Sequence, residues 1–143
     1  MYQIIEYRKD DFHITTDFEK INIDVICLLL GQSYWANSRK RNMVIKSLKN
    51  SLCFSLFHEN KQIGLIRVIT DSATFAYLCD VIIEKEYRHK GLGEWFLGCV
   101  FKYPDLQDLR QWCLITKDAH EFYKKFGFEN LRYPDKFMEI FND

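Results

Sequence analysis

The sequence predicts an α/β domain of three layers, in which about four helices flank a mixed central sheet of about six or seven strands. Three observations lead to this fold class. Residues 51–83 contain three consecutive strand-like runs, helical patterns lie on both sides of them, and a short apolar run follows at 112–116. With 143 residues, the chain is expected to form one domain, residues 1–143.

The first third of the chain is expected to supply one strand and two helices. FHITTDF at 12–18 alternates weakly between apolar and polar residues and predicts a strand. INIDVICLLLGQ at 21–32 predicts a short helix with Asn22 or Asp24 as its cap. RKRNMVIKSLKN at 39–50 places its apolar residues on one helical side, which predicts an amphipathic helix.

The middle of the chain is expected to form an antiparallel meander followed by a helix. SLCFSLFHENKQIGLIRVIT at 51–70 gives two strands joined by a tight turn at 58–61. TFAYLCDVII at 74–83 extends the meander by a third strand. The pattern over 91–103 is helical, and Pro104 ends it because proline cannot continue a helix.

The last third is expected to add one buried strand and one helix. WCLIT at 112–116 is short and apolar throughout, which is typical of a strand buried on both faces. Asp118 is expected to cap a helix over 119–126, and Gly127 lies in the position of its C-terminal cap. The segment FENLRYPDKFMEIF at 128–141 is compatible with one or two further strands.

The composition disfavours several classes of protein. Lysine plus arginine and aspartate plus glutamate each number 20, so the chain lacks the basic excess that nucleic-acid binding requires. The longest apolar run, at 25–31, is too short to cross a bilayer, and residues 1–11 lack the pattern of a signal peptide. We therefore expect a cytoplasmic protein with neither nucleic acid nor a membrane as its partner.

The cysteines predict neither a metal site nor a disulfide framework. They are odd in number, lie singly among apolar residues and form no C-x-x-C pair. Buried, reduced thiols are the expected state of Cys27, Cys53, Cys79, Cys99 and Cys113.

Three of the six glycines lie within residues 91–98, directly after an Arg-His-Lys triplet. The spacing excludes a dinucleotide fingerprint, because Phe96 stands where the third glycine is required. It also excludes a P-loop, because Lys90 precedes the glycines. A strand that leads into a helix start still provides unpaired amide N–H groups for a pyrophosphate, although an ordinary helix-start turn has the same pattern.

Two motifs in this sequence resemble those of the GNAT superfamily of N-acetyltransferases. VIIEKEYRHKGLG at 81–93 resembles the R/Q-x-x-G-x-G/A acetyl-CoA motif, and ITKDAHEFYKKFGFE at 115–129 resembles the N-x-x-A-x-x-x-Y-x-x-x-G-F segment. The resemblance implies a GNAT-like fold from about residue 12 onward. The family's proline is replaced around Lys85 and Glu86, and its asparagine is Thr116, which leaves one cofactor contact uncertain.

The resemblance also implies acetyl-CoA as the acetyl donor and assigns roles to particular residues. Backbone N–H groups at 81–83 would hold the pantetheine arm and polarise the thioester carbonyl, and residues 88–93 would bind the pyrophosphate. Tyr123 stands where the family places the acid that protonates the departing thiolate. The implied cofactor-binding residues are Val81, Ile82, Ile83, Arg88, His89, Lys90, Gly91, Leu92, Gly93, Thr116, Ala119 and Tyr123.

An amine acceptor must lose a proton before it attacks, and Asp80 is the first candidate base. It lies in an otherwise apolar strand, where burial raises a carboxylate pKa unless the group is paired. A buried hydrogen-bonding role is the alternative. Glu84 and His120 are further candidate bases. A covalent route through Cys79 or Cys113 lacks evident His and Asn partners.

The amine acceptor is expected to bind near an aromatic and polar stretch at 32–37. Tyr34 and Trp35 in this stretch could stack on a cationic amine or fill the top of the core. The sequence thus predicts acetyl transfer to a primary amine of a small molecule or protein, by direct attack in a ternary complex. The alternative is a non-catalytic sensor of acyl-CoA. A homodimer is compatible with either function.

Overall fold

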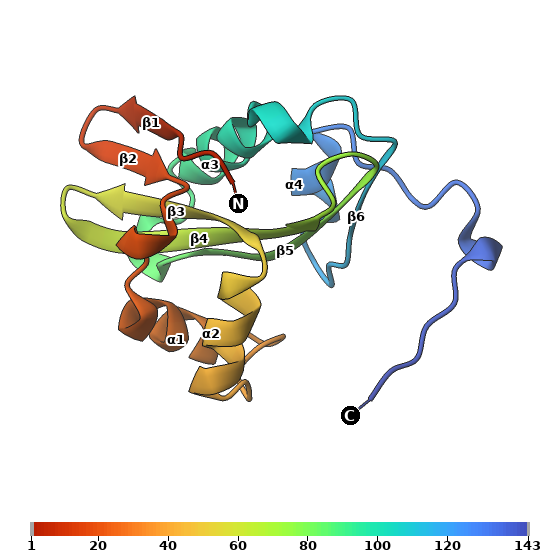
Figure 1. Ribbon diagram of the computed structural model, residues 1–143, viewed down its shortest axis with the longest axis horizontal. Coiled ribbons are helices and arrows are strands. Elements are labelled where there is room, and N and C mark those ends of the chain that lie inside the picture. The colour runs from red at the N-terminus through yellow and green to blue at the C-terminus, as the bar shows by residue number, and fades with distance from the viewer. Residues whose placement is uncertain (1, 143) are drawn as a thin grey trace.

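The computed structural model describes residues 2–142 and contains one six-stranded sheet. The strands follow one another in the order β1-β2-β3-β4-β5-β6, and every neighbouring pair is antiparallel except β5 and β6, which are parallel (Figure 1). Their bounds are Glu6–Lys9, Phe12–Thr15, Leu52–His58, Lys61–Thr70, Phe75–Ile83 and Gln111–Leu114. The mixed sheet expected from the sequence is therefore confirmed.

Four α-helices cover the two faces of this sheet, with α1 and α2 on one face and α3 and α4 on the other (Figure 1). Their bounds are Ile23–Gly31, Arg41–Lys49, Leu92–Phe101 and His120–Lys124. Each face has its own apolar core: Phe96 is fully buried on the α3 side, and Ile26 is fully buried on the α1 side. The three-layer arrangement follows because each helix must bury its apolar stripe against the sheet.

Strand β5 contains a β-bulge at Asp80 and Val81. Arg67 pairs with Cys79 and Leu65 pairs with Ile82, so two residues of β5 oppose one residue of β4. Asp80 has a φ of 48°, the left-handed conformation that aspartate tolerates better than most residues. The extra residue reverses the alternation along the strand.

The side chains on either side of the bulge show this reversal. Ala76 and Leu78 pack into the core beneath α3, and after the bulge the odd-numbered Val81 and Ile83 face that core instead. Ile82 packs with α1 and α2 on the opposite face. The bulge therefore sets which side chains of β5 face each layer.

Strands β5 and β6 separate where the sequence motifs begin. They pair only from Phe75 to Leu78 and from Gln111 to Leu114. Beyond Leu78, β5 has no strand beside it on the β6 side within residues 2–142. The resulting opening exposes the backbone of β5 from Cys79 to Ile83.

The structure corrects the predictions at both ends of the chain. Strand β1 was not expected, because Glu6–Lys9 is mostly charged and carries little alternation. No described residue after Leu114 forms a strand, so the strands considered for 128–141 are absent from the described chain. Strand β6 is consequently the edge of the sheet and only half-buried, although its apolar sequence predicted burial on both faces.

The predicted helix caps are confirmed in part. Asn22 caps α1 by accepting a hydrogen bond from the N–H of Val25 at 3.2 Å. Asp118 does not cap α4, because Ala119 occupies the cap position. Gly127 follows α4 with a φ of 98°, as expected for a residue after a helix end. No helix within residues 2–142 is long and apolar enough to span a membrane.

Candidate active site

A groove of about 960 Å³ lies where β5 and β6 separate, and both sequence motifs contribute to its wall. Its floor is β5 from Tyr77 to Ile83, and the segment after β6 forms the opposite side. The predicted site residues whose atoms line it are Tyr34, Trp35, Asp80, Val81, Ile83, Arg88, His89, Gly91, Gly93, Thr116, Ala119 and Tyr123. Folding thus brings together residues that span about 90 positions of sequence.

Residues 88–93, here called the phosphate loop, connect β5 to the start of α3. The Arg88 Nε donates a hydrogen bond to the carbonyl oxygen of Ile83 at 2.8 Å, which fixes the loop against β5. Gly91 is the N-cap residue of α3, and no side chain caps this helix. The first amide N–H groups of α3 are therefore available to an anion, which the helix dipole also favours.

The glycines of the phosphate loop differ in what the chain requires of them. Gly91 has a φ of 79°, a conformation that L side chains rarely adopt. The φ of Gly93 lies outside this range. A Cβ atom there would lie 3.5 Å from the Phe122 ring, an ordinary contact, so the chain itself does not require glycine. Its lack of a side chain instead leaves room for a second molecule to approach the helix start.

Three predicted cofactor residues do not line the groove with their side chains. Ile82 is buried beneath α1 and α2, and Leu92 is buried in the other core, so each can contact a ligand only through its backbone. The Lys90 ammonium lies 5.9 Å from the centre of the Tyr87 ring, outside the groove lining. Backbone groups therefore dominate this end of the groove.

The second motif supplies the opposite wall through the turn before α4. The Thr116 hydroxyl accepts a hydrogen bond from the N–H of Ala119 at 3.1 Å, which orders the turn where the family's asparagine is replaced. Tyr123 follows on α4, half-buried, with its ring 5.2 Å from that of Phe122.

The Tyr123 hydroxyl stays protonated over the physiological pH range. Burial, aided by the nearby Tyr34 and Asp118, raises its pKa to about 12. A protonated phenol on the groove wall can donate a hydrogen bond to an atom that gains negative charge.

Asp80 is the centre of a buried ionic group that we call the Asp80 cluster: Trp35, Arg39, Arg67 and Asp80. The Arg67 Nε and the Arg39 Nη1 donate to the same carboxylate oxygen of Asp80, at 2.7 and 2.8 Å respectively. The Trp35 indole N–H donates to the other oxygen at 2.9 Å. Asp80 is 4% exposed, so its charge is held almost entirely by these three partners.

The sequence left two states open for Asp80, an unpaired carboxylate with a raised pKa and a paired one, and the structure has the paired one. Burial alone would raise the pKa, but the hydrogen bonds and charges of Arg39 and Arg67 outweigh burial and lower it. Asp80 is therefore ionised and saturated with donors at neutral pH. This geometry fits the buried hydrogen-bonding alternative better than a base that exchanges protons.

Tyr34 and Trp35, in the aromatic stretch at 32–37, are also hydrogen-bonded to other parts of the chain. The Tyr34 hydroxyl accepts a hydrogen bond from the N–H of Lys117 at 3.1 Å, and the Lys117 ammonium lies 5.5 Å from the Tyr34 ring centre. Trp35 donates to Asp80. A cage for a cationic amine, as considered from the sequence, would have to compete with this lysine.

The other candidate bases lie outside the groove lining. Glu84 forms an ion pair with Lys61 at 3.1 Å, and His120 faces a separate hollow beside β6. Burial raises the pKa of the Cys79 thiol to about 11, and it also raises that of Cys113. Neither thiol is a thiolate at neutral pH, which disfavours the covalent route.

Sequence reasoning missed several residues that line this groove, among them the charged residues Arg39, Arg67 and Asp118. Arg39 lies in a basic stretch that predicted only a solvated helix face, and Arg67 lies in an apolar strand. A charged residue inside an apolar strand could have signalled a buried partner for Asp80. Asp118 was assigned to the helix cap.

Comparisons with known proteins identify the family of this chain. The family described as "Acetyltransferase (GNAT) domain" matches residues 49–130, which include the phosphate loop, Asp80 and Tyr123. The chain belongs to the GNAT family. This result confirms the resemblance seen in the two motifs, and the activity class of the family is acetyl transfer.

Two similar proteins are a crystal structure and a curated relative. A Xanthomonas campestris crystal structure assigned to the GNAT family is 37% identical, with a TM-score of 0.89 over 92% of this chain and 93% of that one. A Gibberella zeae protein named as an acetyltransferase is 28% identical over an alignment of 153 positions. The alignment covers 90% of this chain and 85% of that protein.

A more distant GNAT-like structure contains a ligand. A Clostridium acetobutylicum protein, named as an acetyltransferase and solved with acetyl-CoA, has a TM-score of 0.63 over 95% of this chain and 96% of that one. Its identity to this chain is 14%, so the likeness is one of fold.

Proposed function

We propose that this GNAT protein transfers an acetyl group from acetyl-CoA to a primary amine by direct attack in a ternary complex. One observation carries the proposal: a single groove holds the phosphate loop, the open backbone edge of β5 and the Tyr123 hydroxyl. These are the three groups that acyl transfer from a thioester needs. Use of acetyl-CoA by the family, and its presence in the Clostridium structure, support the choice of donor.

The residues of the phosphate loop fit a pyrophosphate. The uncapped start of α3 offers N–H donors and a positive dipole, and Arg88 lies at the same end of the groove. Open space beside Gly91, and the lack of a side chain at Gly93, allow the backbone to be approached closely. Bound acetyl-CoA supplies the thioester, and the free edge of β5 beyond Leu78 supplies backbone dipoles that can polarise its carbonyl.

Tyr123 is proposed to stabilise the leaving sulfur. As the amine nitrogen bonds to the carbonyl carbon and the carbon–sulfur bond breaks, the electron pair moves to sulfur. Because the pKa of Tyr123 is raised to about 12, its hydroxyl keeps a proton to donate to that sulfur.

We place the proton acceptor for the amine at Asp118, acting through water. Of the three carboxylates that line the groove, Asp80 is paired with two arginines and Glu94 with Lys125 at 2.7 Å. Asp118 has no ion pair within residues 2–142, and its charge already acts on Tyr123. It is therefore near the reacting atoms and free to interact with an ammonium group.

We call the part of the groove at the Asp80 cluster, where the amine is proposed to bind, the acceptor end. Its charge favours an amine that also carries an anionic group. Arg39 and Arg67 place two positive charges against the single negative charge of Asp80, and Lys117 lies nearby at Tyr34. The Arg39 side chain is 25% exposed and lines the groove, so it can reach a carboxylate or phosphate. A polyamine would meet repulsion at this end.

The first test is calorimetric titration with acetyl-CoA, CoA, dephospho-CoA and NADH. We expect micromolar binding of acetyl-CoA and none of NADH. Release of thiol is then measured with amino acids, their carboxamides and spermidine as acceptors. Binding without turnover on any amine would favour the acyl-CoA sensor, and absence of CoA binding would overturn the whole proposal.

The acceptor preference has its own control. Amino acids are expected to exceed their carboxamides at least tenfold in kcat/KM, and Arg39→Gln should reduce that ratio without changing acetyl-CoA affinity. Equal rates with both acceptors would reject the anionic acceptor while leaving acetyl transfer intact.

A further inference from the structure

Residues 32–40, here called the α1–α2 connection, lead from the end of α1 to the start of α2 along the groove. The Ser33 hydroxyl orders this connection from within, because it accepts a hydrogen bond from the N–H of Ala36 at 3.1 Å. The connection therefore presents a defined set of side chains to the acceptor end. Those that line the groove are Tyr34, Trp35 and Arg39.

Two of these side chains attach the connection to the floor of the groove. The Trp35 indole N–H and the Arg39 Nη1 both donate to the carboxylate of Asp80, at 2.9 and 2.8 Å respectively. Asp80 belongs to β5 and is almost fully buried. Hydrogen bonds to an ionised acceptor are about twice as strong as those between neutral groups. The connection is thus firmly held on the β5 side.

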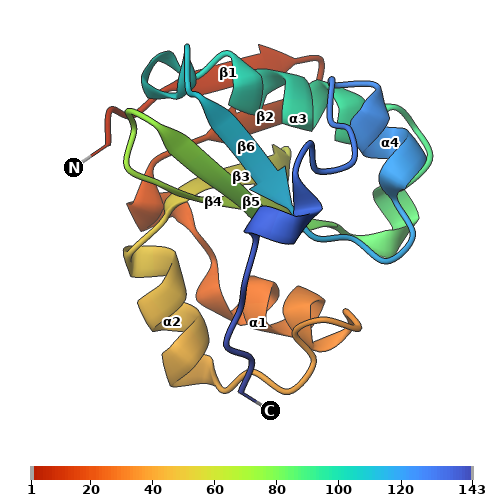
Figure 2. The ribbon, with the colours of Figure 1, turned by 90° about the vertical axis from the view of Figure 1, so that its right-hand side faces the viewer.

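The third side chain, Tyr34, reaches the opposite wall. Its ring packs edge to face on that of Trp35, with the ring centres 5.2 Å apart. Its hydroxyl accepts a hydrogen bond from the N–H of Lys117 at 3.1 Å, and the Lys117 ammonium lies 5.5 Å from the ring centre. Lys117 belongs to residues 115–119, here called the wall turn, which lead from β6 to α4. In Figure 2, the connection after α1 (orange) and the segment between β6 and α4 (blue) lie on the side that faces the viewer.

The wall turn has few other attachments. Pairing of β6 with β5 ends at Leu114, and the hydrogen bond between Thr116 and Ala119 lies inside the turn. In the described part of the chain, residues 2–142, the bond to Tyr34 is the one hydrogen bond that joins 115–119 to a segment distant in sequence. The next polar tie comes after α4, where Lys125 pairs with Glu94 at 2.7 Å.

The position of Tyr123 depends on this turn. Helix α4 begins at His120, directly after the turn, and Tyr123 lies in its first four residues. After burial, Tyr34 is the next cause of the raised pKa of Tyr123, which agrees with two phenols that line one groove near each other. Reacting groups tolerate little displacement, since a shift of about 1 Å can lower a rate roughly 100-fold.

We propose that Tyr34 is a positioning residue: it ties the wall turn to the Asp80 cluster and so holds the Tyr123 hydroxyl at the distance from β5 that acyl transfer requires. This inference rests on the proposed role of Tyr123. It differs from the amine cage considered from the sequence, because the ring and the oxygen of Tyr34 both contact Lys117.

The first test is Tyr34→Phe, which keeps the ring and removes the oxygen that accepts the Lys117 N–H. We expect kcat to fall about tenfold, because Tyr123 is displaced. The calorimetric affinity for acetyl-CoA should stay within a factor of about three, because Tyr34 lies outside the phosphate loop. An active wild type together with an unchanged kcat in Tyr34→Phe would overturn the role of Tyr34.

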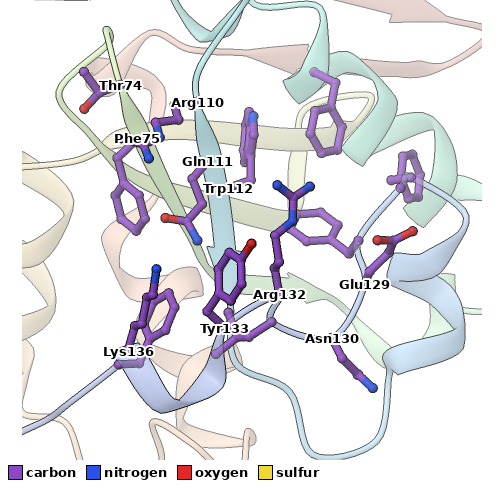
Figure 3. A pocket seen from close by; sticks show the side chains of 16 residues that line it. Thr74, Phe75, Arg110, Gln111, Trp112, Glu129, Asn130, Arg132, Tyr133 and Lys136 are labelled. Carbon is purple, nitrogen blue, oxygen red and sulfur yellow. The ribbon is translucent and has the colours of Figure 1, made fainter.

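Tyr133→Phe is the matched control. Tyr133 is exposed to nearly the same extent as Tyr34, 55% against 54%, and the Lys136 ammonium lies 4.3 Å from its ring centre. Both residues line another hollow of about 810 Å³, shown in Figure 3, and neither lines the groove. This variant should leave kcat unchanged. A loss equal to that of Tyr34→Phe would show that kcat does not report on the tie to the wall turn.

A double-mutant cycle separates positioning from a general structural role. Where Tyr123 is already phenylalanine, there is no hydroxyl left to position, so Tyr34→Phe should then lower kcat less than about twofold. A second loss of about tenfold in that background would mean that Tyr34 acts independently of Tyr123, which would overturn the proposal.

Amide hydrogen exchange at Lys117 tests the tie without any measurement of activity. Exchange should be at least about tenfold faster in Tyr34→Phe than in wild type, and unchanged in Tyr133→Phe. Unchanged exchange in Tyr34→Phe would mean that the tie does not hold the turn. If wild type acetylates no amine, the proposed function fails and the role of Tyr34 fails with it. If wild type is active and only the Tyr34 variants behave otherwise than expected, the role of Tyr34 alone fails.

Discussion

The two ends of the groove are built in different ways. The phosphate loop consists of six consecutive residues and presents mainly backbone groups, whereas the Asp80 cluster joins side chains from three separate segments. Trp35 and Asp80 are 45 positions apart in the sequence, yet they share a hydrogen bond of 2.9 Å. A ligand group that is bound by backbone atoms needs only one short stretch of chain, so its site leaves a local motif in the sequence. A site made of side chains from separate segments leaves no such motif, because its residues meet only in the folded chain.

The Asp80→Asn substitution should have the largest effect, because it removes the charge on which the acceptor end is built. Two arginines would be left without their carboxylate, one of them almost fully buried. We expect a loss of about 3 kcal/mol in the free energy of unfolding, measured by urea denaturation at pH 7. Asp24→Asn is the control, since Asp24 pairs with Arg41 at 2.7 Å on the surface and should contribute less than about 1 kcal/mol.

The difference in free energy of unfolding between wild type and Asp80→Asn depends on pH because the pKa of Asp80 is lowered in the folded state. The stabilisation is complete above the pKa of an unfolded aspartate, about 3.9, and is lost as the pH falls through the lower folded pKa. Unfolding measured from pH 7 to about pH 5 should therefore show a constant difference between wild type and variant. A difference that shrinks near pH 6 would contradict the ionised, paired state.

Gly91→Asp tests the other end of the groove. A carboxylate at the start of α3 should weaken acetyl-CoA binding at least 100-fold by repelling the pyrophosphate, about 2.7 kcal/mol. Gly127→Asp is a matched control, because both glycines have a positive φ and open space around a Cβ atom. Equal loss of affinity in both variants would indicate general backbone strain rather than a phosphate site.

Tyr123→Phe separates chemistry from binding. We expect kcat to fall about 10- to 100-fold while the calorimetric affinity for acetyl-CoA stays within a factor of about three. Since the Tyr123 pKa is raised to about 12, wild-type activity should show no alkaline loss from this group below about pH 10.

Tyr103→Phe is the companion variant for this test. Burial raises the pKa of Tyr103 to about 12 as well, but its hydroxyl donates to the Gln3 carbonyl oxygen at 2.6 Å in the core. It should cost about 1 kcal/mol of stability and leave kcat unchanged. A similar fall in kcat for both variants would remove Tyr123 from the mechanism.

Gly93→Ala should have the smallest effect, and it tests whether the pyrophosphate lies beside the start of α3. The added methyl group would lie 3.5 Å from the Phe122 ring and 3.9 Å from Ile83, both ordinary contacts, so the chain should tolerate it and gain up to about 0.5–1 kcal/mol of helix stability. Acetyl-CoA affinity should nevertheless fall a few-fold, because the methyl group occupies space beside the helix start. Greater stability without weaker binding would mean that the pyrophosphate lies elsewhere.

Most of the sheet and all four helices could be predicted because their signals are local. Strand-like runs separated by short turns located β3, β4 and β5, and a helical apolar stripe located α2. Strand β1 could not be predicted in this way, since Glu6–Lys9 is held by pairing with β2 and by few apolar contacts.

The candidate site was predictable to a different degree at each end. Gly91, Gly93 and Tyr123 follow from the resemblance of two local motifs to those of the GNAT family. The lowered pKa of Asp80 depends on Arg39, which folds onto it from the connection between two helices. No local pattern contains that contact.

The bulge in β5 adds one residue to the strand without changing what the side chains after it face. If Asp80 were deleted, Val81 would oppose Ile66 and the strand would alternate regularly, so Val81 would still face the α3 side and Ile82 the α1 side. Such a deletion would keep both layers and both motifs, but it would remove the carboxylate that the three donors of the Asp80 cluster share. A relative shorter by one residue at this position would therefore keep the fold and lose the centre of the cluster.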